Sequence, residues 1–229
     1  MIKPKENKKC YASVLQRKIL KELAALSYLE SKFFLTGGTA LSVFYIYHRK
    51  SAGLDFFTVD KTDLGKIDFA LKRIWSREVV TVTGSEKFLS LLIKGIKVEF
   101  VIDHLSNRES RPVFGFENGR PLSVDTVRNI ASNKLCAIVS RTEAKDLVDF
   151  YFIRKEFSSL SLSVIFKEAR KKDAIFDDFP SAAFRIEENV SFFRNKPELF
   201  PKMIKKFDMR DFLKFYSDIE EKIYKKLKI

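Results

Sequence analysis

Residues 33–57, FFLTGGTALSVFYIYHRKSAGLDFF, constrain the fold more than any other stretch of this sequence. An apolar run ends at the turn Gly37–Thr39, a mostly apolar stretch follows, and a second apolar run carries one carboxylate, Asp55. Glycine allows a sharp turn and close approach of another group, and a helix N-terminus presents unpaired N–H groups. The order predicts a strand, a turn, a helix over 39–47 and a strand over 54–59. The turn has two interpretations, a phosphate cradle or a purely structural turn.

Alternating apolar residues predict three more strands, over 79–82, 88–94 and 97–102. Glycine and proline indicate a loop around residues 115–121, and apolar residues at helical spacing predict helices over 14–28, 64–74, 123–139 and 143–156. After residue 157 only helical patterns remain, and the last helix has an apolar stripe of Phe212, Phe215, Ile219, Ile223 and Leu227. We therefore expect a mixed α/β fold, with a sheet domain over 1–122 and a helical domain over 123–229.

The charge of the chain points to a polyanionic partner. Its 229 residues carry a net charge of +13, which attracts nucleic acids and nucleotides, although a general lysine bias would give the same number. The two cysteines form no CxxC pair and there are only two histidines, so a structural zinc site is not expected. No apolar run is long enough for a membrane span, and no signal peptide begins the chain. These features predict a cytoplasmic protein with no membrane contact.

Two carboxylates interrupt predicted strands. Asp55 lies between Leu54 and Phe56, and Glu99 lies in the strand KVEFVI. Each acid alone is as well explained by a solvent-facing side of the sheet. If the two strands are neighbours and the acids share a face, their oxygens form a place for Mg²⁺ or Mn²⁺.

A lysine and two acids mark the predicted helices over 123–139 and 143–156. Lys134 lies within an apolar stripe, where a lysine either extends its ammonium group to solvent or is held inside for a purpose. Asp146 and Asp149 are three residues apart and therefore share a helical face, which is most often solvated or salt-bridged.

These motifs together resemble the AbiEii/AbiGii-type nucleotidyltransferase toxins. The resemblance rests on FLTGGTALSVFYIYHRKSAGLDFF, KVEFVIDH and VRNIASNKLCAIVSRTEAKDLVDFYFI, in that order, and extends from Leu15 to the tail segment SFFRNKPELFPKMIKKFDMRDFLKFY. It implies a nucleotidyltransferase fold of the DNA-polymerase-β type, with a mixed sheet flanked by helices and a helical C-terminal domain that completes the active-site cleft. Members act as toxins in toxin–antitoxin or abortive-infection systems, and some transfer a nucleotide from an NTP to tRNA.

Carried over by position, the resemblance implies a role for each candidate residue. The nucleotide-binding set is Gly37, Gly38, Thr39, Arg49, Ser51 and Asp149. The metal ligands for Mg²⁺ or Mn²⁺ are Asp55 and Glu99, and the catalytic set is Asp55, Lys134 and Asp146. The implied partners are an NTP, an RNA acceptor such as tRNA, and a cognate antitoxin.

Gly53 departs from the family pattern. The family has acid-hydrophobe-acid where this chain has Gly53-Leu54-Asp55, and the missing acid normally bridges two metal ions. Its absence predicts weaker metal retention. Three functions follow: a nucleotidyltransferase toxin impaired by Gly53, a catalytically inactive nucleotide-sensing or RNA-binding pseudoenzyme, or an interaction protein that uses the helical tail.

Overall fold

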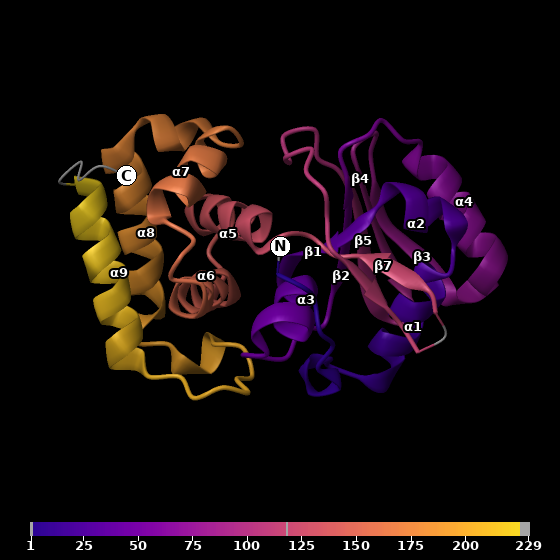
Figure 1. Ribbon diagram of the computed structural model, residues 1–229, viewed down its shortest axis with the longest axis horizontal. Helices are drawn as coiled ribbons and strands as arrows, with labels where there is room; N and C mark the ends of the chain where they lie inside the picture. Colours follow the sequence, from indigo (N-terminus) through magenta and orange to yellow (C-terminus); the bar gives the residue numbers. More distant parts are fainter. Residues whose placement is uncertain (1, 118, 225–229) are drawn as a thin grey trace. The chain divides into compact units, whose positions relative to one another are not determined.

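The predicted strands form one mixed sheet. In the computed structural model, which describes residues 2–117 and 119–224, its strand order is β1-β2-β5-β4-β3 (Figure 1). The strands are β1 (Phe34–Thr36), β2 (Leu54–Thr58), β3 (Val79–Gly84), β4 (Phe88–Ile93) and β5 (Ile96–Ile102). Neighbouring strands are antiparallel except β2 and β5, which are parallel. The mixed α/β fold class is confirmed.

The two central strands have one buried and one half-buried face. Alternate residues point to opposite sides of a strand. On the buried side, no side chain of this set is more than 2% exposed: Leu54, Phe56, Val98 and Phe100. The residues between them are half-buried: Asp55, Phe57, Glu99 and Val101. Both candidate acids therefore lie on the half-buried face of the sheet.

Two helices precede the first strand in the chain, and a third packs at the β3 edge of the sheet. The long apolar pattern over 14–28 forms two helices, α1 (Val14–Ala24) and α2 (Ser27–Lys32), and a short turn η1 (Lys8–Cys10) precedes them. Helix α4 (Leu64–Trp75), followed by the turn η3 (Ser76–Glu78), packs against β3 and β4.

The helix after the glycine turn is shorter and less regular than predicted. Helix α3 (Gly37–Leu41) begins at the first glycine, and the chain continues as a π-helical segment, η2 (Ser42–Ile46). The segment ends at Tyr47, whose φ of +61° reverses the chain. A π-helical turn cannot be told from an α-helix by apolar spacing, because the two differ by one residue in the hydrogen-bond step.

The prediction of a loop without strands around residues 115–121 is wrong. Two short strands, β6 (Val113–Gly115) and β7 (Pro121–Ser123), pair there as an antiparallel hairpin. Gly119 has a φ of +76° and lies in the connection between them. Proline is compatible with pairing at the first residue of a strand. The glycine and proline residues therefore indicated the turn correctly but gave no indication of the two short strands.

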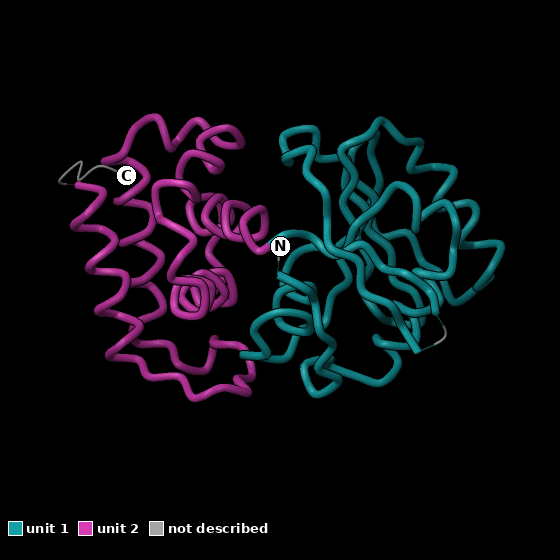
Figure 2. Tube along the Cα trace, viewed as in Figure 1, with its two compact units in different colours: residues 1–126 teal, residues 127–229 magenta. Residues whose placement is uncertain are grey.

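The chain divides into two compact units, Met1–Thr126 and Val127–Ile229 (Figure 2). The division falls four residues later than the sequence pattern suggested, between 126 and 127 in place of 122 and 123. The reason is that Val124 pairs with Leu35 of β1, and the N–H of Asp125 donates to the Leu35 carbonyl (2.8 Å).

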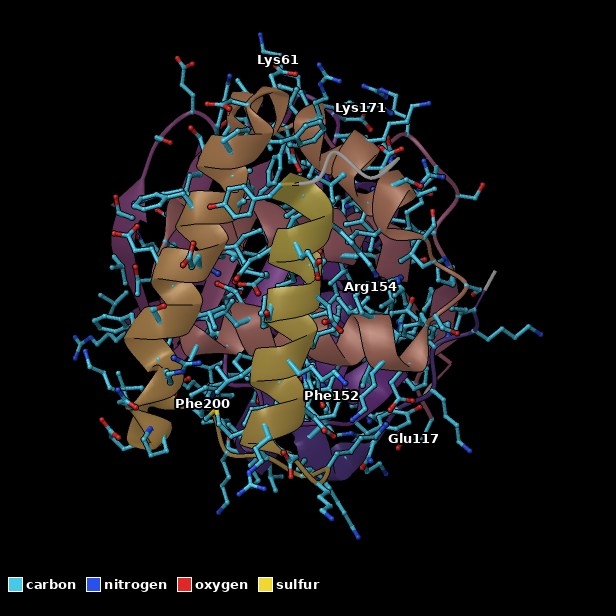
Figure 3. All side chains as sticks on the ribbon, turned by 90° about the vertical axis from the view of Figure 1, so that its left-hand side faces the viewer. Lys61, Glu117, Phe152, Arg154, Lys171 and Phe200 are labelled. Carbon is cyan, nitrogen blue, oxygen red and sulfur yellow. The ribbon has the colours of Figure 1, made fainter. Side chains whose placement is uncertain are left out.

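The regular elements among the described residues of the second unit are all helices, joined by loops. Its elements are α5 (Val127–Ser140), α6 (Ala144–Glu156), α7 (Leu162–Arg170), η4 (Ala174–Asp177), α8 (Phe179–Arg194), η5 (Pro197–Leu199) and α9 (Met209–Tyr224). Asp208 Oδ1 accepts from the N–H groups of Arg210 and Asp211 and caps α9. Phe200, which Figure 3 labels near one end of α9, lies 5.6 Å from Phe212 between ring centres. Leu227 of the predicted stripe lies outside the described residues.

Candidate active site

Two side chains lie against the glycine turn between β1 and α3. Gly37 has a φ of +67°, and a Cβ atom there would lie 2.2 Å from Asp55 Oδ2. A Cβ atom on Gly38 would lie 2.5 Å from Arg49 Nη2. A side chain at Gly37 is disfavoured by the left-handed backbone and by Asp55, whereas a side chain at Gly38 would require the guanidinium end of Arg49 to shift.

The two strand acids are direct neighbours. Asp55 of β2 and Glu99 of β5 are register partners in the parallel pair, so their side chains leave the same face of the sheet. Thr36 at the end of β1 is the partner of Asp55 on its other side. Lys97 Nζ lies 2.6 Å from Glu99 Oε1, and the Glu99 side chain is 22% exposed. The sequence predicted a cation site if the two strands were neighbours and the two acids shared a face, and the pairing of β2 with β5 meets this condition.

Position 53 is the gap in this arrangement. A Cβ atom on Gly53 would meet only Asp55 Oδ1, at 3.8 Å, which is ordinary van der Waals contact. Among the described residues, no group of three or more histidine, cysteine, aspartate or glutamate side chains is placed to hold a metal ion. Asp55 and Glu99 are thus two adjacent carboxylates, and a carboxylate at position 53 would be a third.

Two other acids near the ends of these strands, Asp60 and Asp103, bind to groups close to them. Asp60 pairs with Arg108 (3.0 Å). Asp103 Oδ1 accepts from the N–H groups of Leu105 and Ser106 and so caps a turn. The structure therefore does not offer either acid as a replacement for the missing ligand.

Thr39 and Ser51, both predicted to bind nucleotide, contact each other. Thr39 Oγ1 lies 3.0 Å from Ser51 Oγ and 2.5 Å from the carbonyl oxygen of Gly53, and the Thr39 side chain is fully buried. Gln16 Nε2 also donates to the Gly53 carbonyl (3.2 Å). Gln16 was not among the predicted site residues, because a polar residue in the first turn of an amphipathic helix gives no signal of a buried role.

Most of the segment His48–Ser51 is buried, and only Lys50 is half-buried. Arg49 is 3% exposed, and its Nη1 donates to the Lys50 carbonyl (2.8 Å). The N-terminal segment runs beside it: the Ser51 N–H donates to the Cys10 carbonyl and the Ala12 N–H donates to the Ser51 carbonyl. Residues 10–12 therefore fix the approach to β2.

The three candidates of the helical unit form one buried ion cluster. Lys134 Nζ lies 2.7 Å from Asp146 Oδ1 and 2.7 Å from Asp149 Oδ2. Arg141 Nε donates to Asp146 Oδ2 (2.8 Å). Both aspartates are 0% exposed and Lys134 is 6% exposed, so this lysine is held inside and does not reach for solvent.

The electrostatics of this cluster follow from burial and from its cations. Burial alone raises the pKa of Asp146, but Lys134 and Arg141 outweigh it and hold that pKa below its usual range. Tyr216 donates to the Leu147 carbonyl (2.7 Å) beside the cluster. Burial, and then Asp146 and Asp149, raise the pKa of the Tyr216 phenol, so it stays neutral.

Comparison with known proteins points to one family. A family model described as "Nucleotidyl transferase AbiEii toxin, Type IV TA system" matches residues 18–222. No curated protein matches the chain by sequence.

Solved structures share the fold. A crystal structure from H. pylori, described as a candidate nucleotidyltransferase, has a TM-score of 0.57 and 20% identity, over 96% of this chain and 97% of that chain. JHP933 from Helicobacter pylori gives 0.57 and 19%, over 97% and 95%. The antibiotic-resistance factor ANT(2'')-Ia gives 0.52 and 13%, over 76% and 97%. In the part of the chain that the structure describes, no helix is long and apolar enough to cross a membrane.

Proposed function

Because this chain belongs to the AbiEii family of nucleotidyltransferase toxins, we propose that it transfers a nucleotide from an NTP to an RNA acceptor, with tRNA as the first candidate. The family belongs to toxin–antitoxin systems, and membership therefore implies a cognate antitoxin. The observation that carries the proposal is the pairing of Asp55 with Glu99 on one face of the sheet, beside the turn at Gly37. The net charge of +13 supports an RNA partner.

A divalent cation fits this pair in part. Mg²⁺ and Mn²⁺ take oxygen ligands, and Asp55 and Glu99 would hold the ion from adjacent strands. When bound, the ion supplies positive charge for the transferring phosphoryl group. With glycine at position 53, the proposed site retains the ion weakly, so the chain is an impaired form of the enzyme.

The protein's own residues would bind and orient the nucleotide. We propose that the backbone of Gly37 and Gly38 receives the triphosphate and that Arg49, whose guanidinium group lies against Gly38, supplies a fixed positive charge there. Ser51 lies in the same polar network. Positioning and charge neutralisation are most of what phosphoryl transfer requires of a protein.

The buried cluster of the helical unit enters the proposal through the family resemblance. Lys134 is assigned as the helix lysine that contacts phosphate, Asp146 as a catalytic acid and Asp149 as a nucleotide-binding residue. In the helical unit Lys134 is paired with both aspartates, and Arg141 adds a second positive charge beside Asp146. A contact between Lys134 and phosphate would therefore compete with the two aspartates.

The test is transfer of label from each α-labelled NTP to total RNA, to tRNA and to the protein itself, with Mg²⁺ or Mn²⁺. We expect weak, metal-dependent labelling of RNA, and growth arrest only at high expression. The matched control is Asp55→Asn, which keeps the size of the side chain and removes its charge. Equal labelling by the two proteins would contradict the assignment of Asp55.

A pseudoenzyme is the second candidate, and Gly53 is the observation that favours it. Such a protein would bind NTP or RNA without transfer. Thermal shifts with each NTP measure nucleotide binding, and RNA affinity at several salt concentrations measures RNA binding. Binding of NTP or RNA with no labelling under any condition supports the pseudoenzyme, whereas absence of both NTP binding at millimolar concentration and RNA binding at low salt contradicts both candidates.

A further inference from the structure

The carbonyl oxygen of Gly53 accepts hydrogen bonds from two buried side chains. Thr39 Oγ1 lies 2.5 Å from this oxygen, and Gln16 Nε2 lies 3.2 Å from it. Gln16 Nε2 is also 3.3 Å from Thr39 Oγ1, and both side chains are 0% exposed. The donors come from the first turns of α1 and α3, so a single peptide group just before β2 is held from two helices.

The Gln16 amide is itself fixed at its other end. The side-chain oxygen of Gln16, Oε1, accepts from the N–H of Ala12 (2.9 Å). The main-chain N–H of Gln16 donates to Ser13 Oγ, which caps α1. Ala12 is tied in turn to the Ser51 carbonyl (3.1 Å). A buried amide with both ends bonded has one orientation, because turning it would leave buried polar groups without partners. The chain thus maintains a rigid donor for position 53.

This arrangement surrounds a residue that has no side chain. The space next to Gly53 is open, since an added Cβ would meet only Asp55 Oδ1 at 3.8 Å, and Gly53 has no left-handed φ that would exclude other residues. Positions 53 and 55 are two apart and therefore share a face of the strand. The two donors fix the plane of the Gly53 peptide group, and with it the direction in which a side chain at position 53 would leave the chain.

We propose that Gln16 and Thr39 are positioning residues that clamp the Gly53 carbonyl and direct a side chain at position 53 toward Asp55. The clamp presets a third carboxylate position beside Asp55 and Glu99, although the residue at that position is glycine. The inference rests on the proposed function, because the ion concerned is the one that Asp55 and Glu99 would hold. It also assigns the Thr39 hydroxyl to the protein's own backbone and not to a bound triphosphate.

The test uses the full chain and Mn²⁺ as the probe, with bound ion measured from the loss of the free-ion electron paramagnetic resonance signal. Gly53→Asp is expected to bind Mn²⁺ about tenfold more tightly than the starting protein, because the number of charged ligands sets the affinity. Adding Thr39→Val, which removes the hydroxyl and keeps the shape, should reverse most of this gain, since partners behind a ligand contribute about tenfold or more to affinity. Gln16→Met is the second variant and should act in the same direction.

Thr58→Val is the matched control in the Gly53→Asp background. Thr58 is the last residue of β2, five residues after position 53, and its side chain is as fully buried as that of Thr39. Thermal denaturation identifies any variant that is unfolded. If Thr39→Val or Gln16→Met does not fold, the Mn²⁺ affinity of the other variant tests the positioning role. If the clamp variants bind Mn²⁺ as tightly as Gly53→Asp alone, the positioning role is wrong and the metal site stands. If Gly53→Asp gains nothing over the starting protein, the proposed metal site is wrong and the inference falls with it.

Discussion

The two groups of acids in this molecule differ in how their charge is balanced. In the helical unit, Asp146 and Asp149 are fully buried and Lys134 contacts both at 2.7 Å. In the sheet unit, Asp55 and Glu99 stand side by side on a half-buried face, and Glu99 is paired with the largely exposed Lys97. The acids of the helical cluster share a buried lysine, whereas the lysine paired with Glu99 is largely exposed.

This difference separates two reasons for placing acids together. Buried charges persist only when they are paired, and removing one partner leaves an uncompensated charge inside the protein. Two like charges on adjacent strands oppose each other and are tolerated where a cation binds or where solvent screens them. We therefore expect a change in the helical cluster to alter stability more than the same change beside the sheet pair.

The largest expected effect is that of Lys134→Met. The substitution keeps the aliphatic stem and leaves Asp149 and Asp146 buried without their shared cation, so it should lower the free energy of unfolding by about 3–5 kcal/mol. Urea unfolding measures this, with Lys145→Met on α6 as the exposed control, whose effect should be small. A loss below about 1 kcal/mol for Lys134→Met would mean that the cluster contributes little to stability.

A smaller effect is expected at the glycine turn, where Gly37→Ala and Gly95→Ala form a matched pair. Both glycines have a positive φ, but a Cβ on Gly95 has nothing within 4 Å, whereas one on Gly37 meets Asp55 Oδ2. Gly95→Ala should cost about 1 kcal/mol for its backbone alone, and Gly37→Ala at least about 2 kcal/mol. Equal losses in urea unfolding would show that Asp55 moves aside freely and is not fixed by the turn.

The third prediction concerns acid. The pKa of Asp146 is lowered from its usual 3.8 in the folded protein, so its contribution to stability is present above that value and is lost as pH falls below it, through the folded pKa. The difference in unfolding free energy between the parent protein and Asp146→Asn should therefore be constant near neutrality and shrink below about pH 4. Unfolding curves across this range give the difference, and one that grows on acidification would contradict the sign of the shift.

The smallest effect is expected for Lys97→Met, the counterpart of Lys134→Met on the sheet. The Lys97 side chain is 56% exposed, and such pairs contribute about 0–1 kcal/mol. The same urea experiment should therefore show little change. A loss as large as that of Lys134→Met would remove the contrast between the two groups of acids.

The sequence predicted the fold where apolar spacing was regular. The five sheet strands follow from apolar runs bounded by turn residues, and the helices α4, α5 and α6 follow from apolar spacing of three to four residues. The neighbouring positions of Asp55 and Glu99 follow once β2 and β5 pair. The hairpin β6–β7 was missed because each of its strands has three residues, too few for a period.

The surroundings of the site were harder to predict. The role of Gln16 and the burial of Arg49 depend on contacts between segments far apart in the chain, on which local composition carries no information. The same applies to Lys134: its place in an apolar stripe was visible, but its two partners on the next helix were not.

The most direct test of the account is the rate of metal-dependent nucleotide transfer to RNA by Gly53→Asp and by the unsubstituted protein, each with Asp55→Asn as its control. If the sheet acids form a transfer site that lacks one ligand, Gly53→Asp should raise the rate by orders of magnitude, and Asp55→Asn in that background should abolish the gain. If Gly53→Asp is as inert as the unsubstituted protein, the pseudoenzyme is the better account. If the unsubstituted protein is already fully active, the assignment of Asp55 and Glu99 as the impaired metal site is wrong.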